Sequence, residues 1–133
     1  MAAGTPGVAV RYSGLRELRA ELRRLEDPRY WGREFREAGK QAAGLVAREA
    51  QSRVPQLTGR LRDSIRPLAS QTRAQVAAGK AAVPYAGVIE FGWPARNIRP
   101  QPYLYPAAEA LGDEVADFYL TAVDRLTRRA FPE

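Results

Sequence analysis

The chain opens with a segment in which apolar residues recur at helical spacing. After Ser13, leucines at positions 15, 18, 22 and 25 are separated mostly by Arg and Glu, which predicts an amphipathic helix with Ser13 as its N-cap. We expect this helix to end at Pro28, because proline interrupts a helix interior. Before it, Val8, Val10 and Tyr12 alternate with other residues, and this pattern predicts a short strand or arm.

A second, longer helix is predicted from about Trp31 to Arg53. Val54-Pro55 should close it, since a residue before proline avoids the helical conformation. Gly39 and Gly44 lower the helix propensity, but small residues also let a neighbouring backbone approach closely. The apolar face that we expect this helix to bury consists of Trp31, Phe35, Ala38, Ala42, Leu45, Val46 and Ala50.

The period of the pattern then changes from helical to alternating. Short strands are predicted over Ser64–Leu68, Ala74–Gly79 and Tyr85–Phe91, with interruptions at Pro67 and Pro84. Such strands in sequence favour a small antiparallel sheet.

The third predicted strand ends in Phe-Gly-Trp. Because side chains alternate along a strand, Ile89 and Phe91 should face the core and Glu90 the opposite side. Trp93 lies beyond the glycine, and we expect it to be an exposed anchor, since tryptophan is enriched in interface hot spots.

The C-terminal third combines a proline-rich segment with a last helix. Four prolines, at positions 94, 100, 102 and 106, predict an ordered, extended, partly polyproline-like loop from Trp93 to Pro106. Pro106 suits the first position of a helix. The apolar stripe expected on that helix is Leu111, Val115, Phe118, Ala122 and Leu126.

Together these elements predict an α+β fold. A small antiparallel β-sheet should pack against the long helix and the C-terminal helix, with an extended Pro-rich loop. We expect one domain over residues 1–133, in which 1–7 form a flexible N-terminal arm and 93–106 the extended loop.

Composition narrows the possible functions. The chain has no cysteine and no histidine, which removes disulfides, thiolate nucleophiles, the commonest metal ligand and the usual general base. No cofactor is expected, and a non-enzymatic role is favoured. No apolar run reaches the roughly 20 residues that span a bilayer, so we expect a soluble protein made in a cytoplasm.

Charge is uneven along the sequence. The net charge is +6, but residues 106–133 carry three basic and six acidic side chains. A basic front and an acidic end could attract each other between neighbouring subunits, although solvated helix faces explain any single charge equally well.

Two further segments carry arginines in a setting suited to contacts with a partner. Residues 55–62 combine turn chemistry at Thr58-Gly59 with Arg60 and Arg62, which are either solvated or paired with a neighbour's carboxylate. Residues 96–106 interleave arginines and tyrosines with prolines, a stiff segment with a low ordering cost. The candidate contact residues are Thr58, Arg60, Arg62, Glu90, Trp93, Arg96, Arg99, Pro100, Pro102 and Tyr103.

Three spaced motifs resemble those of a known family. They are Pro-x-x-Thr-Gly-x-Leu at 55–61, Tyr-Ala followed by Glu-Phe-Gly at 85–92, and Pro-x-Pro-Tyr-Leu at 100–104. In this order, and over roughly residues 14–126, the chain resembles the head–tail joining, or tail-completion, proteins of long-tailed bacteriophages. Trp93 departs from the family's pattern, in which a small or basic residue is common at this position.

The resemblance implies a non-catalytic structural protein of the virion neck, assembled in the bacterial host cytoplasm. It implies a homo-oligomeric ring, sixfold or alternatively twelvefold, that completes the tail and joins it to the head connector. Its implied partners are head connector or adaptor proteins, tail terminator or tail-tube proteins, and DNA passing non-specifically through the lumen, with no membrane. The residues alone leave two alternatives open: a basic nucleic-acid-binding module, and a small toxin-type nuclease using Arg, Tyr and Glu90.

Overall fold

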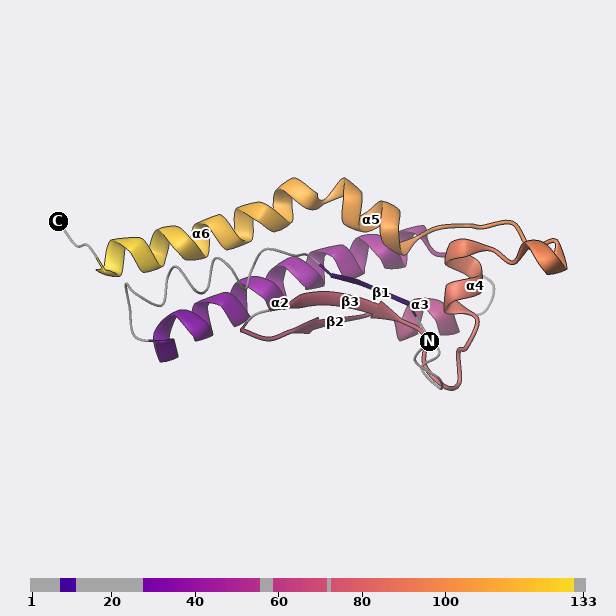
Figure 1. Cartoon of the computed structure of the whole chain (residues 1–133), viewed down its shortest axis with the longest axis horizontal. Helices are drawn as coiled ribbons and strands as arrows, with labels where there is room; N and C mark the ends of the chain where they lie inside the picture. Colours follow the sequence, from indigo (N-terminus) through magenta and orange to yellow (C-terminus); the bar gives the residue numbers. More distant parts are fainter. Residues whose placement is uncertain (1–7, 12–27, 56–58, 72, 131–133) are drawn as a thin grey trace.

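One long helix separates a small sheet from a pair of C-terminal helices. The computed structural model describes residues 8–11, 28–55, 59–71 and 73–130. Helix α2 (Pro28–Arg53) packs against the sheet on one side and against α5 (Leu104–Ala110) and α6 (Gly112–Ala130) on the other (Figure 1). This arrangement confirms the predicted α+β class.

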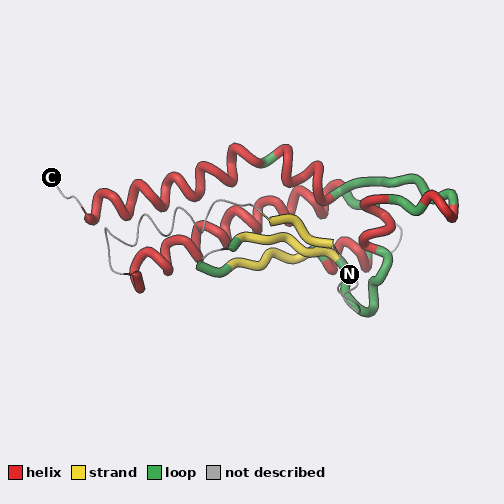
Figure 2. Tube along the Cα trace, in the orientation of Figure 1, coloured by secondary structure: helices red, strands yellow, loops and turns green. Residues whose placement is uncertain are grey.

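The sheet is antiparallel and three-stranded, with β3 in the middle. β1 (Val8–Arg11) and β2 (Arg66–Ala69) flank β3 (Ala74–Ala78) on either side (Figure 2). Val8 is opposite Ala78 in β3, and Arg66 is opposite Ala77. The first three residues of β2, Arg66, Pro67 and Leu68, are exposed. Two of the three strands predicted after residue 60 are therefore confirmed, each within two residues of its predicted ends.

Helix α2 is rich in alanine because it is packed on both sides. Ala38, Ala42, Ala43, Ala47 and Ala50 are all buried. Their small side chains let the sheet and α6 come close to the helix axis, and dense packing of this kind contributes to stability without large side chains.

The start and face of α2 differ slightly from expectation. The helix begins at Pro28, where the missing N–H costs no hydrogen bond. Phe35 and Val46 are buried as predicted, while Leu45 is only half-buried. The side chain of Trp31 and the leucine helix predicted over 13–25 lie outside the described residues.

Gly39 marks the place where three elements meet. A Cβ built on it would lie 2.8 Å from the Tyr119 hydroxyl oxygen of α6 and 3.3 Å from the Cβ of Ala69 in β2. The atoms that approach Gly39 closely are thus side-chain atoms rather than those of a neighbouring backbone, and a Cβ on Gly44 would meet the flexible end of Arg48, at 3.8 Å.

The segment after α2 forms a short helix rather than an extended entry to the sheet. Helix α3 (Arg60–Ser64) follows Gly59, whose φ of 79° lies in the left-handed region that glycine adopts without strain. The buried Ser64 hydroxyl donates to the Leu61 carbonyl oxygen at 2.6 Å and accepts from the Gly79 N–H at 2.9 Å. Ser64 therefore joins α3 to the end of β3.

The strand predicted over Tyr85–Phe91 is wrong, because Ala86–Phe91 forms helix α4. Short apolar runs are compatible with either period. The predicted orientation is wrong for Glu90, which is 3% exposed, and for Phe91, which is 58% exposed, whereas Ile89 is half-buried against the core. As a helix, the segment buries Ala86 and Glu90 one turn apart and places the Glu90 carboxylate at the start of α5.

The single C-terminal helix predicted from Pro106 is divided into two helices in the structure. α5 begins at Leu104, two residues before the predicted start, and places Pro106 in its first turn, where no N–H is needed. A break at Leu111 precedes Gly112, the first residue of α6. Val115, Ala122 and Leu126 are buried as predicted, and Tyr119 joins them.

Tyr119 places a hydroxyl group in the core between α6 and α2. Its ring lies 6.1 Å from that of Phe35, and its buried hydroxyl has no hydrogen-bond partner among the residues that the structure describes. Tyr119→Phe should therefore leave the free energy of unfolding unchanged or raise it by up to about 1 kcal/mol. Tyr103→Phe, the control, should lower it by about 1 kcal/mol, because its hydroxyl donates to the Ala86 carbonyl oxygen at 3.0 Å.

The same variant should change the response to alkali. Burial raises the pKa of Tyr119 from 10.0 to about 12. The unfolded chain therefore loses this proton first, and stability should fall as the pH rises from about 10 to about 12. Urea unfolding across this range should show a smaller fall for Tyr119→Phe. An equal fall in stability in the wild-type protein and in Tyr119→Phe would show that the hydroxyl of Tyr119 does not cause it.

Candidate functional site

A buried carboxylate fixes the region that carries the predicted contact residues. Glu90, on α4, accepts the backbone N–H of Tyr103 at 3.0 Å and that of Leu104 at 2.8 Å through Oε1, and that of Tyr105 at 3.1 Å through Oε2. These N–H groups belong to the start of α5, where no residue of the helix can accept them. The negative charge also complements the positive end of the helix dipole.

The segment between α4 and α5, residues Gly92–Pro102, is called the proline loop below. At its base the Gly92 N–H donates to the Val88 carbonyl oxygen and the Gln101 N–H to the Ile89 carbonyl oxygen, each at 2.7 Å. Trp93 and Ile98 exchange two backbone hydrogen bonds, at 2.8 and 3.0 Å, around the 3-10 turn η1 (Pro94–Arg96). The loop is therefore ordered by its own hydrogen bonds, although most of it is exposed.

The proline loop presents aromatic and basic side chains to solvent. Trp93 is 45% exposed, and the guanidinium carbon of Arg96 lies 5.2 Å from the centroid of its ring. Arg99 is also exposed. Near the base of the loop, the exposed rings of Phe91 and Tyr105 lie 5.5 Å apart. An exposed cluster of this composition is typical of protein interfaces.

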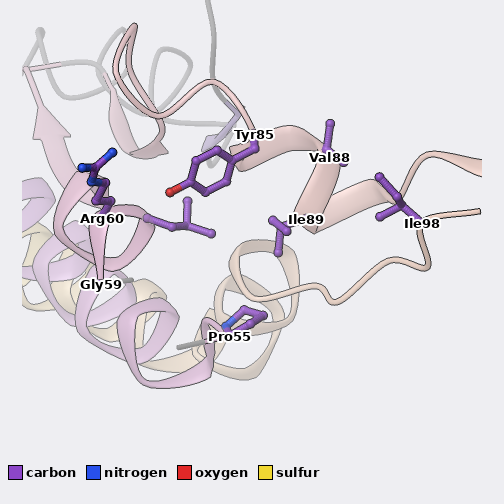
Figure 3. Close-up of a pocket in the computed structure, with 8 residues that line it drawn as sticks. Pro55, Gly59, Arg60, Tyr85, Val88, Ile89 and Ile98 are labelled. Atoms are coloured by element: carbon purple, nitrogen blue, oxygen red, sulfur yellow. The ribbon is translucent and has the colours of Figure 1, made fainter. Parts of the chain in front are cut away.

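An apolar groove lies beside the proline loop. Its volume is about 430 Å³. Gly59 and Arg60 border it, and Figure 3 shows the lining side chains arriving from the end of α2, from α3, from α4 and from the loop. The apolar lining residues are Pro55, Leu61, Tyr85, Val88, Ile89 and Ile98.

Tyr103 is a structural residue of this region. It is fully buried, and burial together with the negative charge of Glu90 raises the pKa of its phenol. Because its hydroxyl is bonded to Ala86 and its N–H to Glu90, its polar groups are used within the chain. Glu90 and Tyr103 are thus parts of the frame, and we do not include them in a contact surface.

The other predicted contact residues fall into two groups, one on α3 and one on the proline loop. Arg60 and Arg62 lie on α3 and are exposed, and Arg60 borders the groove. Thr58 lies outside the described residues. Those that the structure brings together on the exposed proline loop are Trp93, Arg96, Arg99, Pro100 and Pro102.

The sequence interpretation missed the groove. A strand over Tyr85–Phe91, as predicted, would not place Tyr85, Val88 and Ile89 on one side. Their spacing of three and four residues was the signal that could have revealed a common helical face.

The described residues offer no site for metal chemistry and no membrane span. Nowhere in these parts of the chain do three His, Cys, Asp or Glu side chains gather as metal ligands would. Within the same residues, every helix is too short or too polar to cross a bilayer.

Comparison with known proteins identifies the family. A sequence profile described as "Bacteriophage HK97-gp10, putative tail-component" matches residues 16–92, more than half of the 133 residues. No curated protein and no solved structure matches the chain significantly. The matched range contains the first two motifs, at 55–61 and 85–92, whereas the third lies beyond its end. The profile match confirms the resemblance drawn from those motifs: this chain belongs to the HK97-gp10-like family of bacteriophage tail components, and its role is that of a structural protein of the virion.

Proposed function

We propose that this protein is a subunit of a ring in the phage neck that completes the tail and joins it to the head connector. The ring would contain six copies, or alternatively twelve. Neighbours on its two sides would be connector or adaptor proteins and tail terminator or tail-tube proteins. DNA would pass through the lumen and contact arginines without sequence preference.

The observation that supports this proposal most directly is the proline loop. Its start is held by the Gly92–Val88 hydrogen bond and its end by the Gln101–Ile89 hydrogen bond and by Glu90. The side chains of Trp93, Arg96 and Arg99 remain exposed. A segment that is already ordered loses little conformational entropy when it binds. Such a loop is suited to docking and offers no arrangement of groups for catalysis.

The nuclease alternative loses its candidate carboxylate. Glu90 is buried and already accepts three backbone N–H groups. A general base needs a lone pair directed at the proton it abstracts, and this carboxylate is directed at the start of α5. We therefore do not propose cleavage of nucleic acid.

Deletion of the gene from the phage or prophage that carries it tests the proposal. Filled heads and finished tails should then accumulate separately in electron micrographs, and adding the purified protein should join them. Joined particles in the absence of the protein, or a deletion that abolishes the tails themselves, would contradict it.

Substitutions on the proline loop should separate docking from folding. Trp93→Ala should reduce the yield of joined particles about tenfold or more, because exposed tryptophans are frequent hot spots. Leu68→Ala on β2 is a matched control, since both side chains are 45% exposed. Equal yields from the two variants would remove Trp93 from the docking surface.

A further inference from the structure

Helix α6 carries an exposed row of side chains that we call the acidic stripe: Asp113, Asp117, Leu120 and Asp124. Their spacing of four, three and four residues places them on one face of the helix, and all four are exposed. Leu120 is 62% exposed, more than any other large apolar side chain described. Leu120 is therefore an exposed apolar side chain with carboxylates on the same face of the helix.

Among the residues that the structure describes, one carboxylate of the acidic stripe has an ion-pair partner and two have none. Asp124 pairs with Arg128 at 3.1 Å. Asp113 and Asp117 make no ion pair with any residue that the structure describes. The stripe therefore presents the carboxylates of Asp113 and Asp117 on the N-terminal side of Leu120 and the ion-paired Asp124 on its C-terminal side.

The apolar groove and the proline loop have the complementary character. The groove is lined by apolar side chains and bordered by Arg60. The proline loop carries Arg96 and Arg99 and no acidic residue. One surface thus offers an apolar cavity beside positive charge, and the other an apolar side chain beside negative charge.

We propose that the acidic stripe of one copy docks onto the apolar groove and proline loop of a second copy, with Leu120 entering the groove. A helix that places its apolar side chains in a groove is a common mode of protein recognition, and opposite charges fix its register. The groove lies at the end of the molecule that holds α3 and α4, whereas α6 extends toward the other end (Figure 1). Two different surfaces make the contact head-to-tail, the kind that closes rings.

This inference deepens the proposed function, because a ring requires such a contact between copies. It is also narrower than that function. It names the two surfaces that meet and the chemistry by which each recognises the other.

Cross-linking tests the contact directly, since the chain has no cysteine of its own. Ile98→Cys and Leu120→Cys proteins would be mixed and treated with a short thiol-to-thiol cross-linker, which is less demanding in geometry than a disulfide. The mixture should yield dimers that neither variant gives alone. The double variant should yield a ladder of multimers that stops at the size of the ring.

The control mixture pairs Ile98→Cys with Leu68→Cys, whose exposed side chain lies on β2. Cross-linking should be performed on the purified protein and on assembled particles, and thermal melts should confirm that each variant is folded. Yields no higher than those of the control mixture in both preparations would overturn the proposal. So would Leu120→Cys proteins that cross-link mainly to themselves, because that result places α6 against α6.

Charge reversal supplies a second, independent test. Replacing Asp113 and Asp117 with arginine should weaken self-association about tenfold, and so should replacing Arg96 and Arg99 with aspartate. Mixing the two reversed proteins should restore the contact. If the mixture associates no better than either variant alone, these charges do not face one another.

The two proposals fail in distinguishable ways. Joining of heads and tails that survives in the charge-reversed proteins, together with no cross-link, would overturn this contact and leave the neck function intact. Specific cross-links in a protein that fails to join heads to tails would overturn the neck function and leave the contact intact.

Discussion

Replacing Glu90 with alanine should lower the free energy of unfolding by about 3–5 kcal/mol, the range found when one partner of a buried charged network is removed. The carboxylate is 3% exposed and accepts the N–H groups of Tyr103, Leu104 and Tyr105. Without it, these donors are desolvated and unpaired at the start of α5, and the segment that follows the proline loop loses three hydrogen bonds to α4. Urea unfolding followed by circular dichroism measures the change.

A second substitution at the same position refines this prediction. In Glu90→Gln, the amide oxygen can still accept from Tyr103 and Leu104, but the NH₂ group would face the N–H of Tyr105. The expected loss is about 1.5–3 kcal/mol, the cost of leaving one such donor unsatisfied. Native-state hydrogen exchange should show faster exchange of these three amides, because their protection depends on the carboxylate.

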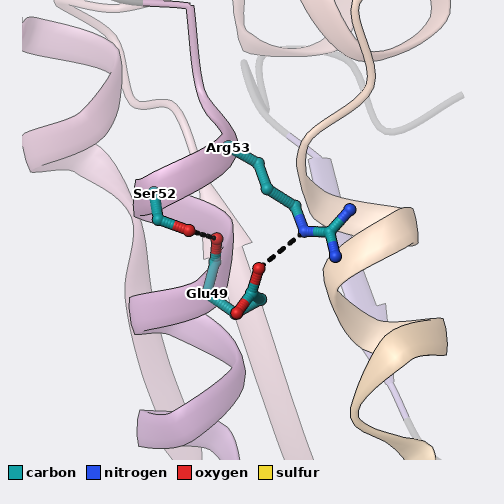
Figure 4. A network of polar contacts seen from close by, with 3 residues as sticks. All are labelled: Glu49, Ser52 and Arg53. Atoms are coloured by element: carbon teal, nitrogen blue, oxygen red, sulfur yellow. Dashed lines mark hydrogen bonds and ion pairs between the residues drawn. The ribbon is translucent and has the colours of Figure 1, made fainter.

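Glu49→Ala is the matched control. Glu49 accepts from Arg53 Nε at 2.8 Å in a pair whose side chains are 36% and 38% exposed (Figure 4). The Ser52 hydroxyl bonds to the backbone oxygen of Glu49 at 2.7 Å, and the substitution leaves that bond in place. An exposed helix pair contributes about 0.5 kcal/mol or less. Similar losses at positions 49 and 90 would show that the buried network does not hold α5.

Gly92→Ala is expected to be the second most damaging change, with a loss of about 2–4 kcal/mol in unfolding free energy. Gly92 has φ 76° and ψ 178°, a combination that is essentially restricted to glycine. A Cβ there would lie 2.8 Å from the Ile98 carbonyl oxygen and 2.8 Å from the Pro100 nitrogen. Both are backbone atoms, so that the proline loop itself would have to open.

Two other glycines distinguish the two causes of the loss at Gly92, which are the positive φ and the steric overlap of a Cβ with the backbone. Gly87, inside α4, has an ordinary φ and open space for a Cβ, so Gly87→Ala should be neutral or stabilising by up to about 1 kcal/mol. Gly59 has φ 79° and open space, and its alanine variant should lose only the backbone term of about 1 kcal/mol. Chemical denaturation should rank the losses as Gly92, Gly59, Gly87, and a different order would refute this account of the proline loop.

The long-range pattern of the sequence was enough to predict the main frame. The helix ending at Arg53, the strands around residues 66–69 and 74–78, and the stripe through Val115, Ala122 and Leu126 all follow from period and from proline or glycine boundaries. In each of these, many residues repeat the same signal. The three spaced motifs likewise predicted the family, because they depend on identity and spacing rather than on conformation.

The candidate site could not be predicted in the same way. Residues 85–91 are too few to distinguish a period of two from one of 3.6, and the choice depends on Glu90 meeting three N–H groups that lie 13 to 15 residues later. No local sequence pattern predicts that the side chain of Glu90 is buried. The groove depends on the same tertiary contact, because it forms only when α4 stands beside α3 and the proline loop.

The exposed start of strand β2 has a consequence for the protein before it assembles. β2 lies at an edge of the described sheet and begins with Arg66 and Pro67. Proline has no N–H to offer to an incoming strand, and an edge charge opposes the close approach of a second sheet. Copies gathered at high local concentration therefore have a barrier against pairing through their backbones into aggregates. The copies therefore associate through contacts between side chains, which are more specific and more reversible than backbone pairing.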